Sequence, residues 1–215
     1  MSINADMAPE YSVLGPDDDL PDRPFTATYL TEQDHGVVRR LLSDLQGFLR
    51  DVDAGKRKVN PYDRYAWQVE GLTHRLLICD EKRLRDHQEL CVVGFFGDRR
   101  AEVDIAPLEK ANIAIVEEFN EYPGILSYSS MELADGHWAN MVLHDDPVDT
   151  EYWRKSKLHQ HAVSFLSPQH YKRVRLHNGR LTAGLFDDPE IIINKTKYLD
   201  FSGEPEWRAE RTLIE

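Results

Sequence analysis

Three histidines stand close together in the segment KSKLHQHAVSFLSPQHY, which covers residues 155–171. Histidine is the side chain that most readily exchanges protons near neutral pH, and its neutral ring is a common metal ligand. Three roles are therefore open to His159, His161 and His170. They can form a metal site, supply acid and base groups, or belong to an ordinary helix surface.

The apolar spacing predicts one amphipathic helix over residues 150–166, ended by Ser167 and Pro168. At about 100° per residue, His159 lies within the apolar arc of this helix, whereas His161 lies at its polar border. A site built from all three histidines is therefore not expected. Burial favours the neutral imidazole of His159, which can bind a metal or act as a base. A hydrogen-bonded core histidine is the alternative.

Two further groups of polar residues have spacings that suit chemistry. Tyr128 and Glu132 share one face of an expected strand, where they would serve as hydrogen-bonding or proton-transfer groups if that face lines a pocket. His144, Asp145 and Asp146 stand together at the end of the next strand. They form either a hard-metal or acid–base cluster, or a polar turn before a helix.

The composition excludes several classes of partner. The chain has 215 residues and a formal net charge of -12, which argues against nucleic acid and against an anionic membrane surface. It contains no apolar run long enough to span a membrane, and its start lacks the pattern of a signal peptide, so we expect a cytoplasmic protein. Cys79 and Cys91 are expected to act as small apolar residues.

The first part of the chain divides into an arm and a helical extension. Residues 1–24 are rich in proline and aspartate and predict a flexible arm. Apolar residues recur at three and four within residues 25–87, which predicts a helical hairpin formed by residues 32–52 and 62–79. A charged turn at residues 80–89 leads into the next element.

Residues 88–202 predict an α+β domain. The order of elements is strand, helix, strand, strand, helix, strand, which is the ferredoxin-like split βαβ arrangement. A further strand is expected at residues 190–201, and residues 203–215 are expected to form a charged peripheral tail. The six elements of the split βαβ unit are expected at residues 90–96, 107–122, 125–133, 137–145, 150–166 and 172–181.

This element order resembles the dimeric α+β barrel superfamily over roughly residues 88–202. In that superfamily two such sheets face each other and enclose a pocket, and its members include haem enzymes, cofactor-free monooxygenases and proteins without known activity. The resemblance implies a homodimer and a pocket for a small apolar ligand between the sheet and the helix of residues 150–166. The alternative is a monomer in which the N-terminal helices cover the open face of the sheet.

A local pattern is similar to that of the haem-dependent aldoxime dehydratases, which are built on the same architecture. Their proximal histidine lies on a helix with a tryptophan and a serine, and a strand of arginine, leucine and histidine follows. This chain has Trp153, Ser156 and His159, and then Arg-Leu-His at residues 175–177. The resemblance implies that His159 is the axial ligand of a haem iron and that His177 lies near the haem edge.

A haem would also need partners for its propionates, and Arg173 or Arg175 could supply charge-assisted hydrogen bonds to them. The sequence thus favours a small-molecule pocket protein, a haem-binding oxidoreductase or dehydratase in its most specific form. The first alternative is a cofactor-free monooxygenase of the antibiotic-biosynthesis type, in which Tyr128, Glu132 or a pocket histidine orients the substrate for reaction with oxygen. The second is a non-catalytic protein whose helical hairpin docks a partner.

Overall fold

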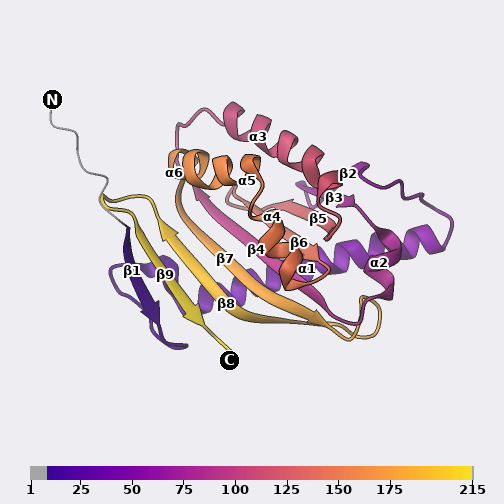
Figure 1. Cartoon of the computed structure of the whole chain (residues 1–215), viewed down its shortest axis with the longest axis horizontal. Helices are drawn as coiled ribbons and strands as arrows, with labels where there is room; N and C mark the ends of the chain where they lie inside the picture. The colour runs from indigo at the N-terminus through magenta and orange to yellow at the C-terminus, as the bar shows by residue number, and fades with distance from the viewer. Residues whose placement is uncertain (1–8, 215) are drawn as a thin grey trace.

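A single mixed sheet organises the chain in the computed structural model, which describes residues 9–214 (Figure 1). The strands are β1 (Glu10–Leu14), β2 (Arg64–Val69), β3 (Leu72–Ile78), β4 (Leu90–Arg99), β5 (Ile125–Glu132), β6 (Trp138–His144), β7 (Tyr171–Thr182), β8 (Glu190–Asp200) and β9 (Trp207–Thr212). They lie in the order β1-β9-β8-β7-β4-β6-β5-β3-β2. Neighbouring strands are antiparallel, except that β1 runs parallel to β9.

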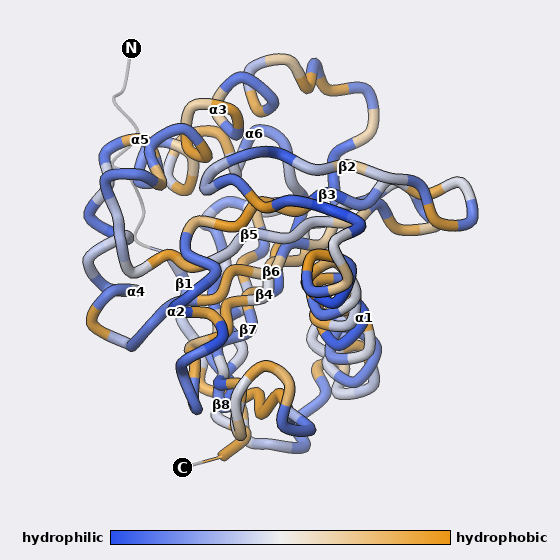
Figure 2. The backbone as a smooth tube through the Cα atoms, turned by 90° about the vertical axis from the view of Figure 1, so that its right-hand side faces the viewer, coloured by the Kyte–Doolittle hydropathy of each residue, from blue (hydrophilic) through white to orange (hydrophobic). Residues whose placement is uncertain are grey.

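Helices cover both faces of the sheet. They are α1 (Thr28–Asp53), α2 (Glu81–Asp86), α3 (Ala106–Glu117), α4 (Pro147–Trp153), α5 (Lys157–His161) and α6 (Ser167–His170), with a π-helical turn at Ala162–Leu166 and 3-10 turns at Pro24–Thr26 and Glu118–Glu121. Figure 2 shows α1 along one face of the sheet, with α3 and α5 on the other side. Between residues 9 and 214, no helix combines the length and the apolar character that a membrane crossing requires.

The central part of the sheet has the predicted ferredoxin-like arrangement. Along the chain, β4, α3, β5, β6, α4 to α6 and β7 follow one another, and in space the strands lie in the order β7-β4-β6-β5. The α+β fold class and this element order are therefore confirmed. The apolar run of β4 is buried against α1 through Val92 and Phe96 and half-buried on the side of α3, where Val93 and Phe95 line a pocket.

The face opposite α3 is closed by α1 within the same chain. The 26-residue helix buries an apolar stripe that includes Leu41, Leu45 and Leu49, which pack against the strands in one large core. A homodimer that encloses the pocket between two facing sheets would need this same face, which is already filled. The N-terminal helix α1 thus covers the open face within one chain, as in the alternative that we considered, while a homodimer formed through another surface stays a prediction.

Two carboxylates of α1 also bind buried polar groups of the sheet. Asp34 accepts hydrogen bonds from Arg175 Nε at 2.6 Å and Nη2 at 3.0 Å, and its Oδ2 lies 2.8 Å from His177 Nε2. Farther along the helix, Asp44 Oδ2 lies 2.5 Å from Nδ1 of the buried His74. The two contacts fix the rotation and the position of α1 on the sheet.

The prediction of a second helix in the N-terminal hairpin is wrong. Residues 62–79 form the antiparallel pair β2 and β3, joined at Glu70 and Gly71, whose φ angles are 53° and 82°. Two positive φ values in a two-residue loop are the mark of a tight β-hairpin turn. When the two short strands are taken as one segment, their apolar residues recur at intervals of three and four, which is also the spacing of an amphipathic helix. The hairpin of helices that we considered as a docking element is therefore not formed.

The sheet also extends into both ends of the chain, where we expected an arm and a tail. Strand β9 lies in the segment expected to be peripheral, and it buries Trp207, Ala209 and Arg211. Strand β1 lies in the expected arm and pairs with β9, while residues 1–8 of that arm lie outside the described residues. The predicted peripheral placement is thus wrong for residues 207–212. This segment pairs with β8, and its alternation buries one set of side chains while Arg208 and Thr212 stay exposed.

The expected continuous helix over residues 150–166 is also wrong. Asp146 accepts from two backbone N–H groups and starts α4, and Ser156 Oγ accepts from His159 N at 3.1 Å and starts α5. Pro168 lies in the first turn of α6 and does not end the helical segment. The internal cap at Ser156 divides the segment, which a projection along one straight axis could not reveal.

The contacts of α1 lead to a first prediction about stability. Replacing Asp34 with alanine leaves His177 without this partner and leaves Arg175 only Asp98, 3.8 Å away, and we expect a loss of about 3–5 kcal/mol in the free energy of unfolding. Asp51→Ala is the matched control, because Asp51 pairs with Lys56 and Arg57 at the surface and should contribute under about 1 kcal/mol. Urea unfolding measures both, and equal small losses would show that α1 does not depend on Asp34.

Candidate functional site

A pocket of about 480 Å³ lies between the sheet and the helical layer of α3 to α6. Ligand pockets for small molecules typically have volumes of about 300–1,000 Å³ and mainly apolar walls with a few polar groups. The apolar part of the wall comes from the sheet and both helical segments and includes Val93, Phe95, Leu108, Ile115, Phe119, Val142, Trp153, Val163, Val174, Leu176, Leu199 and Phe201. The polar part includes Tyr128, Asn140, His144, Arg154, His159 and Lys197.

Two histidines of the wall are held in the neutral form. Burial, assisted by the guanidinium of Arg154 and the ring of His159, lowers the pKa of His144 to about 4. Burial also lowers the pKa of His159 to about 4, again assisted by Arg154. Both rings are therefore available at neutral pH as hydrogen-bond acceptors, bases or metal ligands.

His144 has an unsatisfied nitrogen. The side chain lies at the end of β6 and is 1% exposed. Its Nδ1 is buried and has no hydrogen-bond partner within residues 9–214. Buried polar atoms are nearly always paired, so an unpaired ring nitrogen in a pocket wall indicates a position where a ligand or a water molecule could bind.

His159 is positioned by its neighbours in the helical layer. Its backbone N–H is capped by Ser156, whose hydroxyl also donates to Glu118 Oε2 at 2.5 Å. The imidazole lies against the indole of Trp153, with ring centroids 5.0 Å apart. The predicted inward direction of His159 is confirmed by its place in the pocket wall, and the predicted exposure of His161 is confirmed as well.

The structure brings Tyr128 into the pocket but leaves Glu132 outside it. Burial raises the pKa of Tyr128 to about 12, so its phenol remains protonated and can donate a hydrogen bond. Glu132 does not contribute to the wall, and it accepts a hydrogen bond from Thr73 N at 3.2 Å. Of the two proton-transfer candidates on β5, only Tyr128 can meet a ligand there.

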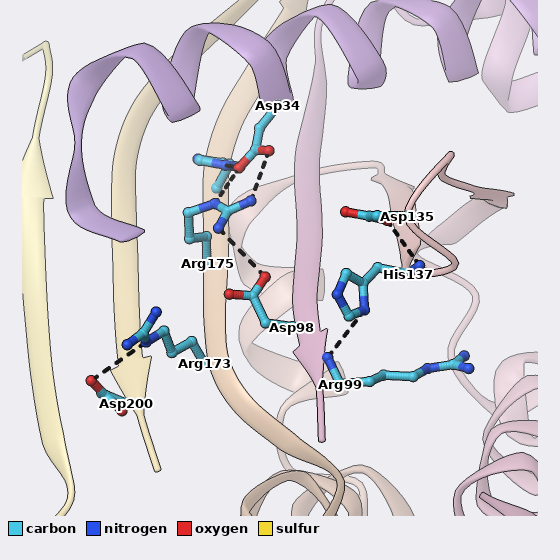
Figure 3. A network of polar contacts seen from close by, with 9 residues as sticks. Asp34, Asp98, Arg99, Asp135, His137, Arg173, Arg175 and Asp200 are labelled. Atoms are coloured by element: carbon cyan, nitrogen blue, oxygen red, sulfur yellow. Dashed lines mark hydrogen bonds and ion pairs between the residues drawn. The ribbon is translucent and has the colours of Figure 1, made fainter. Parts of the chain in front are cut away.

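His177, Arg173 and Arg175 lie on the opposite face of the sheet from His159. Figure 3 shows Arg175 directed at Asp34 of α1 and Arg173 directed at Asp200, with Nε to Oδ2 distances of 2.6 and 3.8 Å. Strand alternation turns these odd-numbered residues of β7 toward α1, while Val174 and Leu176 face the pocket. The expected roles of His177 at a haem edge and of the two arginines at its propionates are therefore corrected.

The side chains of His144, Asp145 and Asp146 point to different places and do not form one cluster. Asp145 pairs with Arg83 and lies 2.8 Å from His87, while Asp146 caps α4. Only His144 turns into the pocket. Across residues 9–214, no three histidine, cysteine or acidic side chains are grouped closely enough to hold a metal ion by themselves.

Arg154, Lys197 and Asn140 belong to the wall and were not among the residues that the sequence singled out. Asn140 follows from strand alternation, because it shares a face of β6 with Val142 and His144. Arg154 and Lys197 gave no such signal. Arg154 is followed by Lys155 and Lys197 lies two residues from Lys195, and only the packing of the helical layer and β8 directs Arg154 and Lys197 inward.

Comparison with known proteins identifies no family. No protein-family model and no curated protein matches the chain. Among solved structures, protein SO0527 from Shewanella oneidensis has a TM-score of 0.38 and 12% identity, covering 55% of this chain and 96% of that one. A monooxygenase candidate from Lactobacillus acidophilus has a TM-score of 0.40 and 9% identity, with 56% and 57% covered.

An aldoxime dehydratase has a TM-score of 0.31 and 14% identity, covering 66% of this chain and 37% of that one. TM-scores below 0.5 at such identities establish neither a family nor an activity for this chain. The ferredoxin-like order therefore stands on the strand topology itself.

The neutral state of His144 gives a prediction about pH. Its pKa is lower in the folded protein than in the unfolded chain, so the unfolded state binds more protons below about pH 6.5, and stability falls as the pH drops. Between pH 7 and pH 5, His144 should account for about 2 kcal/mol of this loss. Urea unfolding of His144→Gln should show a correspondingly smaller loss over that interval. His161→Gln, at an exposed position, should keep the wild-type loss; an unchanged loss in His144→Gln would count against a buried neutral ring.

Proposed function

We propose that the pocket between the sheet and the helical layer binds a small, largely apolar molecule, and that the protein is an oxidoreductase or a dehydratase. The observation that carries the proposal is the pair of neutral histidines in an apolar wall. A buried ring nitrogen without a hydrogen-bond partner, such as Nδ1 of His144, is costly to keep unless a ligand pairs with it. Haem is the occupant that we propose first, with His159 as its axial ligand.

The residues of the pocket fit a haem in part. His159 supplies a neutral nitrogen on a short helix, and the aromatic and aliphatic walls suit a flat apolar macrocycle. Arg154 and Lys197 take the place of Arg173 and Arg175 as cations for the propionates, since only the former pair lies in the wall. When bound, haem supplies an iron centre for redox or Lewis-acid chemistry.

The protein groups around such an occupant have separate tasks. Tyr128 keeps its proton and can donate a hydrogen bond to a substrate oxygen or nitrogen. His144 can accept a proton, because its ring is neutral and its Nδ1 has no partner in the described part of the chain. Phe119 and Trp153 exclude water from the same space. Together they would orient a substrate and move a proton within a dry pocket.

Titration of the purified protein with haem tests the proposal. Wild-type protein should shift the Soret band of haem with one equivalent bound, and His159→Ala should abolish the shift or weaken haem binding at least about ten-fold, because the axial bond is lost. His161→Ala is the matched control, since it removes the same side chain from an exposed position of the same short helix. This variant should bind as the wild type does.

Two results would contradict the proposed occupant. One is the absence of any Soret shift in the wild type, and the other is an equal shift in wild-type and His159→Ala protein. A circular dichroism spectrum of each variant confirms that the protein is folded, so that loss of the shift reports on the ligand.

A cofactor-free monooxygenase is the second candidate, and the orphaned nitrogen of His144 favours it. Oxygenation without a cofactor begins with proton removal from an electron-rich substrate such as a quinol, and the neutral imidazole of His144, in the same pocket as Tyr128, can accept that proton. Oxygen uptake by haem-free protein with a quinol should then fall at least about 100-fold in His144→Gln. Uptake that is equal in both proteins, or absent in the wild type, would remove this candidate.

A further inference from the structure

The charged side chains in the pocket wall are all basic. The chain as a whole has 38 acidic and 26 basic side chains. The wall of the pocket nevertheless contains two cations, Arg154 and Lys197, beside the neutral His144 and His159, and no aspartate or glutamate. An apolar, poorly hydrated space with only positive charge on its wall favours an anionic ligand.

Lys197 is the cation of the wall that lacks a partner. It lies on β8, on the same side of the sheet as Leu199, and its ammonium forms no ion pair within residues 9–214. Glu210 stands opposite Lys197 on β9, but its carboxylate is bound to Lys195 Nζ at 2.7 Å. A half-buried ammonium beside apolar side chains is costly unless a counter-ion joins it.

Arg154 brings a second positive charge to the same side of the pocket. Its Nη2 donates to Asn178 Oδ1 at 3.1 Å, and it also pairs with the exposed Glu151. Asn178 lies on β7 two residues beyond Leu176, which is the register partner of Lys197. Both cations therefore lie over β7 and β8, whereas Trp153 packs with Phe119 in the apolar cluster beside α3.

We propose that the ligand of this pocket is an apolar molecule with a carboxylate, and that Lys197 binds the carboxylate, with Arg154 as the second cation. The inference rests on the proposed function that the pocket holds a small molecule. An aryl or alkyl carboxylic acid and the propionate of a haem share this chemistry. Lys197 is a specificity residue in either case, because an ester or amide of the same shape leaves its charge uncompensated.

Isothermal titration with 2-naphthylacetate and 2-naphthylacetamide tests the choice of headgroup. The two probes have nearly the same size and differ in charge. Wild-type protein should bind the carboxylate at least about ten-fold more tightly, and Lys197→Met should reduce this preference at least about five-fold, since a charge-assisted hydrogen bond is lost while Arg154 remains. Lys197→Arg should restore the preference.

Lys172→Met is the matched control. Lys172 is an exposed lysine of the neighbouring strand β7 that is not part of the pocket wall, so its loss changes the net charge equally without affecting the pocket. Its preference for the carboxylate should remain that of the wild type. A parallel titration compares haem with its dimethyl ester and reports whether a propionate is the source of the anion.

The outcomes separate the two proposals. Equal binding of the charged and neutral member of each pair to wild-type protein overturns the carboxylate inference but leaves the pocket as a binding site. A preference for the carboxylate that is as large in Lys197→Met as in the wild type overturns the role of Lys197. If neither naphthyl probe nor either form of haem binds, the proposed small-molecule function fails, and the carboxylate inference fails with it.

Discussion

The contact between α1 and one face of the sheet is the constraint on which the rest of the structure depends. A ferredoxin-like sheet has one face covered by its own two helical segments, and the other face must be buried by something else. Here the leucine stripe of α1 fills that face, and Asp34 binds Arg175 and His177 beneath the helix. Because Asp34 is buried and hydrogen-bonded to both Arg175 and His177, α1 has one well-defined position on the sheet.

Closing that face decides which face can bind a ligand. The side chains of β7 illustrate this. Arg175 and His177 bind Asp34 of α1, whereas Leu176 between them faces the pocket. The pocket side is left incompletely filled because its helical cover is divided by the caps at Asp146 and Ser156 into short segments. A structural ion pair and a candidate site therefore share one strand but lie on opposite sides of it.

The central fold and part of the candidate site could be predicted from the sequence. The strand and helix order from β4 to β7 follows from uninterrupted apolar runs and from turn residues, which are local signals. His159 was placed inward correctly, although Leu158 and Phe165 of the same projected apolar arc are exposed because the segment is not one straight helix. The β2 and β3 pair was missed, since two short strands with a tight turn at Glu70 and Gly71 imitate the apolar spacing of a helix.

The sequence by itself determined the α+β class, the ferredoxin-like order and the inward direction of His159. The tertiary structure alone decided that α1 covers the open face and that His144 and His159 line one pocket. It placed Arg173, Arg175 and His177 outside that pocket. It also gave β9 its place in the sheet and turned Lys197 inward. The reason is that local periodicity fixes how side chains alternate within an element, whereas the partner on each face depends on residues far apart in the chain.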